Sequence, residues 1–255
     1  MPPRQLSPYE KNQLARYGQK HISLEAYGEM PVEYITGKVE FCNHVFAVTP
    51  DTLIPRVETE ELVALALATA KQLPTNKIIQ IADIGTGCGA IAISLYLALA
   101  ELHRPMQILA SDISEAALAV AQQNSAELIG DNANIMFIQS DLLSAYPATK
   151  FDLMVANLPY IPSERIPFLE DSVTQYEPHL ALDGGPDGLK YIKKLLWQAR
   201  SLLTDQGKIL LEIDYTHTAD YLIQQLPLTG YSLQVIEDQF SRNRFAIIQR
   251  KTTAI

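Results

Sequence analysis

Short apolar runs alternate with amphipathic segments from residue 78 onward. The apolar runs cover residues 78–84, 107–110, 135–139 and 151–156, and apolar residues recur at helical spacing over 91–102 and 115–129. This alternation predicts strands joined by crossover helices. The sequence therefore predicts a parallel sheet with helices on both faces.

The pattern continues to the end of the chain with a change of strand direction. We expect a helix over 189–203 with Trp197 on its apolar side, a strand over 208–213, a helix over 219–226 and strands over 231–236 and 244–249. The last two runs are joined by a loop too short for a crossover helix, so the last strand should run antiparallel to its neighbour. The predicted fold class is α/β, with a seven-stranded, mostly parallel sheet.

The first part of the chain predicts a small appendage. Ser7 is suited to begin a helix, with Pro8 in the first turn and Glu10 completing a capping box, and we expect this helical arm over residues 8–29. A hairpin turned by Asn43 and a helix over 58–73 follow. We divide the chain into a helical arm (1–36), a hairpin and front loop (37–57) and a main domain (58–255).

Composition narrows the function classes. The chain has 255 residues, a net charge of −9 and 47% apolar residues, as an ordinary globular protein does. The negative charge disfavours binding that depends on many phosphate contacts, so we do not expect a nucleic acid partner. The two cysteines indicate a reducing compartment, and the five histidines lack the spacing of zinc ligands. With no secretory signal and no apolar run long enough to cross a bilayer, we expect a cytoplasmic monomer without metal or membrane partner.

A glycine loop joins the first strand of the main domain to its first helix. It reads Asp83-Ile84-Gly85-Thr86-Gly87-Cys88-Gly89, at a place where open α/β sheets bind ligands. Dinucleotide enzymes hold a pyrophosphate on a similar turn, so the glycines alone do not identify the ligand. Asp83 would repel a pyrophosphate and attract the ammonium and sulfonium groups of S-adenosylmethionine. We therefore predict S-adenosylmethionine as the cofactor, held by Asp83, Gly85, Thr86, Gly87 and Gly89.

Two further acidic residues follow the next two strands. Asp112 and Ile113 follow the second strand, where a carboxylate can accept both ribose hydroxyls of an adenosine. Asp141 and Leu142 follow the third strand, where they can meet the adenine edge. Asp112 could instead cap the next helix, and Asp141 could be a turn residue. Acids at three successive strand ends, together with the glycine loop, favour the cofactor interpretation.

The segment Asn157-Leu158-Pro159-Tyr160 follows the fourth strand. A polar Asn157 at a buried strand end needs hydrogen-bond partners. An amide or an exocyclic amine offers two N–H donors, which the side-chain oxygen of Asn157 and the backbone carbonyl of Leu158 could accept together, with Tyr160 against the planar group. In isolation the segment could be only a turn. Beside the cofactor loop it predicts the site of the target nitrogen and of the cofactor's methyl end.

These motifs resemble the class I S-adenosylmethionine-dependent methyltransferases, and more closely the release-factor glutamine N5-methyltransferase family. The resemblance spans about residues 31–250 and includes, besides the motifs above, 31–37, Phe41, 53–60, 176–189 and 211–213. It implies a Rossmann-like methyltransferase sheet and methyl transfer to a glutamine in the Gly-Gly-Gln segment of a peptide-chain release factor. It assigns catalysis and substrate binding to Asn157, Leu158, Pro159 and Tyr160.

Several residues on either side of these motifs have two interpretations. Glu177 and Pro178, together with Asp183-Gly184-Gly185, could shape the entrance for a peptide substrate, although Asp-Gly-Gly is equally a plain hairpin turn. Arg56 could hold the front loop by pairing with a carboxylate, or it could be a solvated arginine, which is the commoner case.

The chain departs from the family pattern in three respects. Leu158 stands where the family usually has proline, Val57 replaces the proline of the family's Pro-Glu-Thr-Glu, and the helical domain that the family uses to grip its substrate is shortened. Leucine at position 158 keeps the backbone carbonyl but gives a looser chain than proline does.

Two other functions stay open on sequence alone. An adenine-N6 methyltransferase acting on RNA or DNA would use the same Asn-Leu-Pro-Tyr geometry on a base amine, although the net charge opposes it. The second of these functions is that of a non-catalytic subunit that only binds S-adenosylmethionine. It is opposed by the presence of the site residues Asp83, Asp112, Asn157 and Tyr160. A glutamine in another protein, such as a ribosomal protein, is a further substrate to test.

Overall fold

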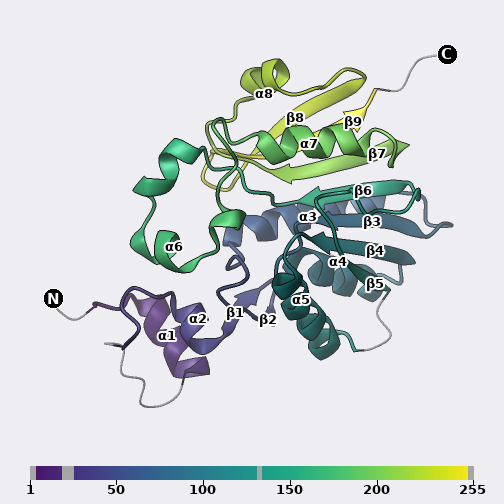
Figure 1. Ribbon diagram of the computed structural model, residues 1–255. Helices are drawn as coiled ribbons and strands as arrows, with labels where there is room; N and C mark the ends of the chain where they lie inside the picture. The colour runs from purple at the N-terminus through teal and green to yellow at the C-terminus, as the bar shows by residue number, and fades with distance from the viewer. Residues whose placement is uncertain (1–3, 19–25, 131–133, 252–255) are drawn as a thin grey trace.

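The computed structural model describes residues 4–18, 26–130 and 134–251, and its centre is a seven-stranded sheet. The strands lie in the order β5-β4-β3-β6-β7-β9-β8 (Figure 1). The strands β3 to β7 pair in parallel, and β9 runs antiparallel to both β7 and β8. The predicted α/β fold is therefore confirmed, including the antiparallel last strand. The bounds are β3 Ile79–Ile84, β4 Met106–Asp112, β5 Ile135–Gln139, β6 Phe151–Ala156, β7 Leu203–Glu212, β8 Tyr231–Glu237 and β9 Asn243–Arg250.

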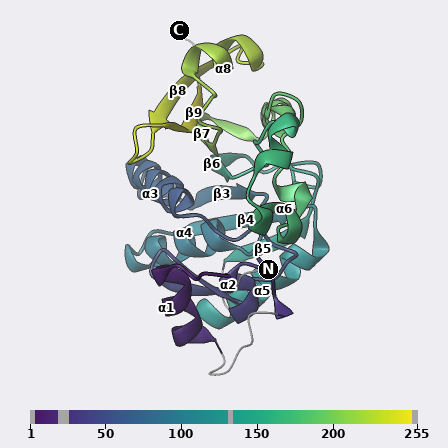
Figure 2. The same cartoon turned by 90° about the vertical axis from the view of Figure 1, so that its left-hand side faces the viewer.

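Helices cover both faces of this sheet because its strands are apolar on both sides. In β6, Leu153 and Val155 belong to one buried cluster, and Met154 and Ala156 belong to the other. The first cluster packs on α3 (Val57–Gln72), α4 (Ala90–Glu101) and α5 (Glu115–Leu128), and the second packs on α7 (Lys190–Ala199) and α8 (Ala219–Gln225). Figure 2 shows α3 and α4 together on one side of the sheet.

Two predicted helices are shorter than expected. The N-terminal helix α1 covers Pro8–Tyr17, with the predicted capping box at Ser7, and Gly18 ends it because glycine is a poor helix former. Of the remainder of the expected arm, residues 19–25 lie outside the described residues, residues 27–29 form a turn, and α2 follows at Val32–Thr36. The helix expected over 189–203 ends at Ala199, and Leu203 begins β7.

The prediction that Trp197 lies on the apolar side of its helix was wrong. The buried face of α7 consists of Ile192, Leu195, Leu196 and Ala199, and the Trp197 side chain lies outside that face with 66% of its surface exposed. The helical spacing of the buried residues places position 197 toward solvent.

The hairpin of β1 (Lys38–Phe41) and β2 (His44–Ala47) is fastened to the main domain by Asn124 of α5. Its turn residues Cys42 and Asn43 have φ values of 47° and 62°, as a tight hairpin turn requires, so the prediction of a turn at Asn43 is confirmed. The Asn124 side chain accepts from the Ala47 N–H at 2.7 Å and donates to the carbonyls of Ala47 at 3.0 Å and Cys88 at 2.8 Å. One buried amide therefore links the hairpin to the glycine loop.

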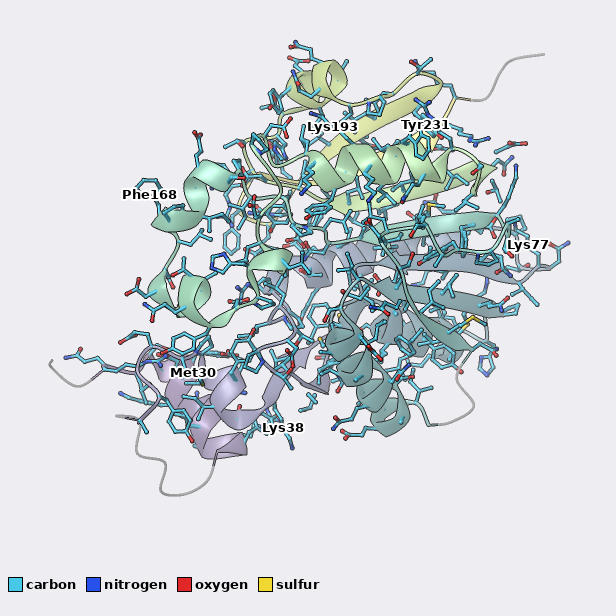
Figure 3. All side chains as sticks on the ribbon, viewed as in Figure 1. Met30, Lys38, Lys77, Phe168, Lys193 and Tyr231 are labelled. Atoms are coloured by element: carbon cyan, nitrogen blue, oxygen red, sulfur yellow. The ribbon has the colours of Figure 1, made fainter. Side chains whose placement is uncertain are left out.

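A long insertion between β6 and α7 was not predicted as structure. It contains two short 3-10 helices, η2 (Ser163–Phe168) and η3 (His179–Ala181), and the α-helix α6 (Asp171–Tyr176) between them. The Tyr176 hydroxyl donates to the Tyr27 carbonyl at 3.2 Å, so this insertion meets the N-terminal part of the chain at one end of the sheet (Figure 1). Phe168 lies at the outer end of η2 (Figure 3), with 87% of its side chain exposed.

Within the described ranges, no helix is both long enough and apolar enough to cross a membrane.

Replacing Asn124 by alanine should destabilise the protein because it leaves the part-buried backbone groups of Ala47 and the buried carbonyl of Cys88 without this partner. Each unpaired group costs roughly 1–3 kcal/mol, so the free energy of unfolding should fall by about 2 kcal/mol or more. Urea denaturation measures the change, and Gln122→Ala on the exposed side of the same helix is the control. An Asn124→Ala protein as stable as the control would show that the amide does not fasten the hairpin.

Candidate active site

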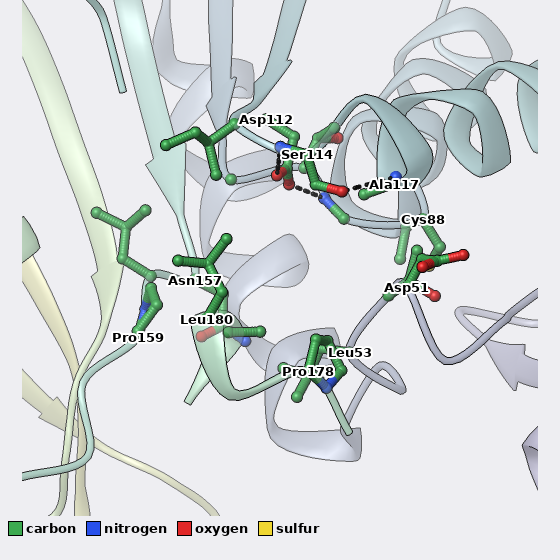
Figure 4. A pocket seen from close by; sticks show the side chains of 18 of the residues that line it. Asp51, Leu53, Cys88, Asp112, Ser114, Ala117, Asn157, Pro159, Pro178 and Leu180 are labelled. Carbon is green, nitrogen blue, oxygen red and sulfur yellow. Dashed lines mark hydrogen bonds between the residues drawn. The ribbon is translucent and has the colours of Figure 1, made fainter. Parts of the chain in front are cut away.

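A cavity of about 260 Å³ lies at the carboxyl ends of β3, β4, β5 and β6. Because parallel strands end at the same edge, the motifs that follow them meet there (Figure 4). The predicted site residues that line the cavity are Gly85, Thr86, Gly87, Asp112, Ile113, Asp141, Leu142, Asn157, Leu158, Pro159 and Pro178. The predicted residues outside its lining are Asp83, Gly89, Tyr160 and Glu177. Residues that the sequence did not single out for a role complete the wall, among them Leu53, Thr59, Leu180 and Tyr191.

The glycine loop exposes backbone to the cavity and lets two helices approach. Gly85 and Gly87 have φ values of 75° and 55°, which a residue with a side chain adopts only with strain. Gly89 has a packing role, because a Cβ there would lie 2.9 Å from Ile93 and 3.3 Å from the Ala121 Cα on α5. This contact explains why Gly89 lies behind the cavity wall.

Asp83 lies beneath the loop and is fully buried. One carboxylate oxygen accepts from the Thr86 hydroxyl at 2.6 Å and from the Ala92 N–H at 3.1 Å, and the other oxygen, Oδ1, has no partner among the described residues. Burial raises the pKa of Asp83 to about 7, against the effect of both hydrogen bonds. Asp83 therefore holds the loop from below, and its Oδ1 is left without a hydrogen-bond partner in the described part of the chain.

Asp112 faces the cavity and holds the glycine loop. Its carboxylate accepts from the Gly87 N–H at 2.9 Å and from the Ser114 N–H at 3.0 Å. Ser114, which accepts from the Ala117 N–H, is the cap of α5, so the alternative of Asp112 as the capping residue does not apply. Each carboxylate oxygen keeps a free lone pair for a ligand hydroxyl.

Asp141 and Leu142 form the wall beyond β5. The Asp141 carboxylate is half exposed and pairs with Lys194 of α7. Its carbonyl also accepts from the Ser144 N–H at 3.2 Å, so Asp141 is at once a turn residue and a residue of the cavity wall. Leu142 has a φ of 55° and is buried.

The Asn157 segment is held by backbone contacts as well as by its own side chains. Leu158 is buried and its side chain packs over Gly85, so the leucine that replaces the family's proline ties this segment to the glycine loop. A Cβ at Gly184 would lie 2.7 Å from the Pro159 carbonyl, and one at Gly188 would lie 2.2 Å from the Tyr160 carbonyl. Glycine is required at both positions for this close approach.

The alternative of a plain hairpin at Asp183-Gly184-Gly185 does not hold. Asp183 pairs with Ile161 in a parallel bridge, and the Gly184 N–H donates to the Ile161 carbonyl at 2.9 Å. This segment therefore supports the chain that follows Tyr160.

Tyr160 lies outside the cavity wall. The sequence had predicted that it lies against a planar group of the substrate, and the structure places it elsewhere. Its hydroxyl donates to Glu212 of β7 at 2.8 Å, and the Thr59 hydroxyl of α3 donates to the other oxygen of the same carboxylate at 2.8 Å. The Asn157 side chain in turn donates to the Thr59 hydroxyl at 3.1 Å. Burial raises the pKa of Glu212, whereas the two hydroxyls and the charge of Arg244 oppose the rise.

Arg56 pairs with Glu177 at 2.5 Å, and the Glu177 side chain is buried. This pair joins the front loop to the insertion, so the alternative of a solvated Arg56 is wrong. Burial raises the pKa of Glu177 and the charge of Arg56 opposes the rise. Glu177 therefore holds the neighbouring Pro178 and Leu180 in place, and these two residues line the cavity.

The residues present fit S-adenosylmethionine. The unpartnered Oδ1 of buried Asp83 favours a cation nearby, Asp112 has acceptor capacity for ribose hydroxyls, and Ile113 offers an apolar surface, 48% exposed, for a flat ring. Asn157 adds an amide to the same cavity. The arrangement can hold a nucleoside with a cationic tail and a second, hydrogen-bonding group together.

Comparisons with known proteins identify the family. The methyltransferase small domain family matches residues 65–177. The release factor glutamine methyltransferase of Lactococcus lactis subsp. lactis is 39% identical over 229 residues, which cover 89% of this chain and 80% of that protein. The enzyme of the same name from Moorella thermoacetica is 45% identical over 185 residues, covering 72% of this chain and 62% of that protein.

A solved structure supports the fold. The ribosomal protein L11 methylase of Lactobacillus delbrueckii subsp. bulgaricus superposes with a TM-score of 0.55 at 24% identity, covering 80% of this chain and 84% of that one. The fold and the sequence relatives thus agree. The chain belongs to the release factor glutamine methyltransferase family, a family of S-adenosylmethionine-dependent methyltransferases.

Proposed function

We propose that this protein transfers a methyl group from S-adenosylmethionine to the side-chain amide nitrogen of a glutamine, in the Gly-Gly-Gln segment of a peptide-chain release factor. The observation that carries this proposal is that Asn157 lines the same cavity as the glycine loop and Asp112. A nitrogen acceptor site and a cofactor site are therefore adjacent. The names of the sequence relatives favour glutamine over the adenine alternative and over a non-catalytic role.

The cofactor is held by residues from three strand ends. The backbone of Gly85, Thr86 and Gly87 approaches its amino acid part, and Asp112 accepts its ribose hydroxyls. Ile113, Asp141 and Leu142 enclose the adenine. Asp83 acts from below through the loop and through its negative charge, and Gly89 keeps α4 and α5 close enough for the loop to form.

When bound, S-adenosylmethionine supplies an electrophilic methyl group on its sulfonium. An amide nitrogen is a poor nucleophile because its lone pair is delocalised, so holding it in line with the methyl group contributes much of the rate enhancement. Asn157 Oδ1 and the Leu158 carbonyl accept its two N–H groups and stabilise the positive charge that develops on it. As the new N–C bond forms, the bond between sulfur and the methyl group breaks and leaves S-adenosylhomocysteine, and the methylated amide releases one N–H proton to solvent. Pro159 restricts the backbone of this loop, and Tyr160 anchors it through Glu212.

The substrate protein approaches from the side of the insertion and the N-terminal part. Pro178 and Leu180 line the cavity from the insertion, and Phe168 projects from it (Figure 3). We assign residues 58–255 to methyl transfer, and the helical arm (1–36) with the hairpin and front loop (37–57) to the substrate side. The reaction then takes place in the cytoplasm, where translation terminates.

Replacing Asp112 by alanine should weaken S-adenosylmethionine binding, because the ribose loses a charged acceptor and the Gly87 N–H loses its partner. A charged hydrogen bond contributes about 1.5–3 kcal/mol, so the dissociation constant should rise roughly tenfold or more. Calorimetric titration measures this constant. Asp205→Ala, at an exposed carboxylate in β7, is the control, and equal affinity in both variants would contradict the assignment.

Replacing Asn157 by alanine should abolish most turnover and leave cofactor affinity nearly unchanged. The loss of one oriented polar group in a water-poor site slows a reaction by about a hundred- to thousandfold. Single-turnover methyl transfer at saturating cofactor separates the two effects. An Asn157→Ala enzyme with the parent rate would refute the mechanism whatever the substrate.

The substrate is tested by offering labelled S-adenosylmethionine with purified release factors, ribosomal proteins and RNA in parallel. We expect label on a glutamine of a release factor, resistant to nuclease. Label confined to adenine in RNA or DNA would overturn the proposed function, and label on a ribosomal protein would reassign the substrate.

A further inference from the structure

A buried chain of hydrogen bonds connects Asn157 to Glu212. Tyr160 and Thr59 donate their hydroxyl protons to the two oxygens of Glu212, each at 2.8 Å, and Asn157 donates Nδ2 to Thr59 Oγ1 at 3.1 Å. The members come from the loop after β6, from α3 and from β7. Glu212 is 1% exposed and Thr59 is 3% exposed, so water does not replace either partner.

This chain of hydrogen bonds has one direction. An ionised carboxylate only accepts hydrogen bonds, and a hydroxyl has one proton to give. Because the Thr59 hydroxyl uses its one proton in the hydrogen bond to Glu212, the Thr59 oxygen can only accept a hydrogen bond from the next group. The group that faces it must therefore be the NH₂ of Asn157, and the amide oxygen is left for whatever enters the cavity.

We propose that Glu212 and Thr59 are positioning residues that fix the orientation of the Asn157 amide, so that the site accepts a nitrogen carrying hydrogens and rejects a carboxylate. This inference rests on the proposed function for the identity of the substrate. We call the hydrogen bonds from Asn157 through Thr59 to Glu212 the relay. Without the relay, Asn157 would be free to turn its NH₂ toward the cavity. Glutamine and glutamate differ only at the side-chain end that meets Asn157, where glutamine has an NH₂ and glutamate has an oxygen. The relay then determines the preference for glutamine.

The structure offers matched variants for a test. Thr59→Val keeps the shape of the side chain and removes the hydroxyl, and Thr59→Ser keeps the hydroxyl. Thr69→Val makes the same change at a buried threonine of α3 outside the cavity wall and serves as the packing control.

The first measurement needs no substrate. Hydrogen exchange of the Asn157 side-chain NH₂, followed by nitrogen-15 NMR, should be slow in the parent, Thr59→Ser and Thr69→Val proteins. It should be about tenfold faster in Thr59→Val, the change expected from the loss of one ordinary hydrogen bond. Equal exchange in all four proteins would overturn the relay.

The second measurement concerns specificity. Binding of a release factor and of its glutamine-to-glutamate variant is compared with S-adenosylhomocysteine present. The preference for glutamine should fall about tenfold in Thr59→Val, and it should stay at the parent value in Thr59→Ser. A purely structural role would lower the thermal midpoint or both affinities without changing their ratio, and an unchanged ratio would contradict the proposal.

The failure of the relay and the failure of the proposed function are distinguishable. A parent enzyme that transfers no methyl to a release factor refutes the proposed substrate, and the exchange measurement still decides the relay. A parent enzyme that is active on a release factor, with a Thr59→Val variant equal to Thr59→Ser in exchange, preference and rate, refutes the relay alone.

Discussion

The burial of the Glu212 charge is the constraint on which the site depends. A carboxylate shielded from water needs hydrogen-bond donors, and here two hydroxyls from different elements supply them. Thr59 and Tyr160 are thereby drawn to the end of β7. If the loop that carries Asn157 moved away from α3, that carboxylate would lose the Tyr160 hydroxyl, one of its two hydrogen-bond donors.

Close backbone packing completes this arrangement. Gly184 and Gly188 let the end of the insertion lie directly against the carbonyls of Pro159 and Tyr160, at distances that exclude any side chain. Leu158 packs over Gly85 and so couples the acceptor segment to the cofactor loop. The two halves of the proposed reaction are therefore held by one continuous set of contacts.

The sequence predicted the sheet well because its strands are buried on both faces and alternate with helices. It also predicted the residues at the strand ends, because parallel strands bring their carboxyl ends to one edge. It failed for the insertion after β6, which lacks a long apolar periodicity, and for Trp197, which is exposed although it follows the buried Leu196 in the helix.

Sequence reasoning could not find the partners of the site residues. Thr59 and Glu212 lie in segments that resemble the family, but the Asn157–Thr59 hydrogen bond spans 98 residues of sequence and the Thr59–Glu212 hydrogen bond spans 153. Asp83 shows a similar limit, since its charge suggested direct contact and its full burial indicates action through the loop. The local sequence pattern predicts where strands end and which residues stand there. It does not predict hydrogen-bond partners, because these depend on tertiary packing.

The most direct measurement is a crystal structure of the protein with S-adenosylhomocysteine and a peptide that contains the target glutamine. The account predicts the glutamine amide nitrogen within about 2.7–3.2 Å of both Asn157 Oδ1 and the Leu158 carbonyl, beside the cofactor sulfur. A glutamine bound elsewhere, or facing the NH₂ group of Asn157, would contradict it.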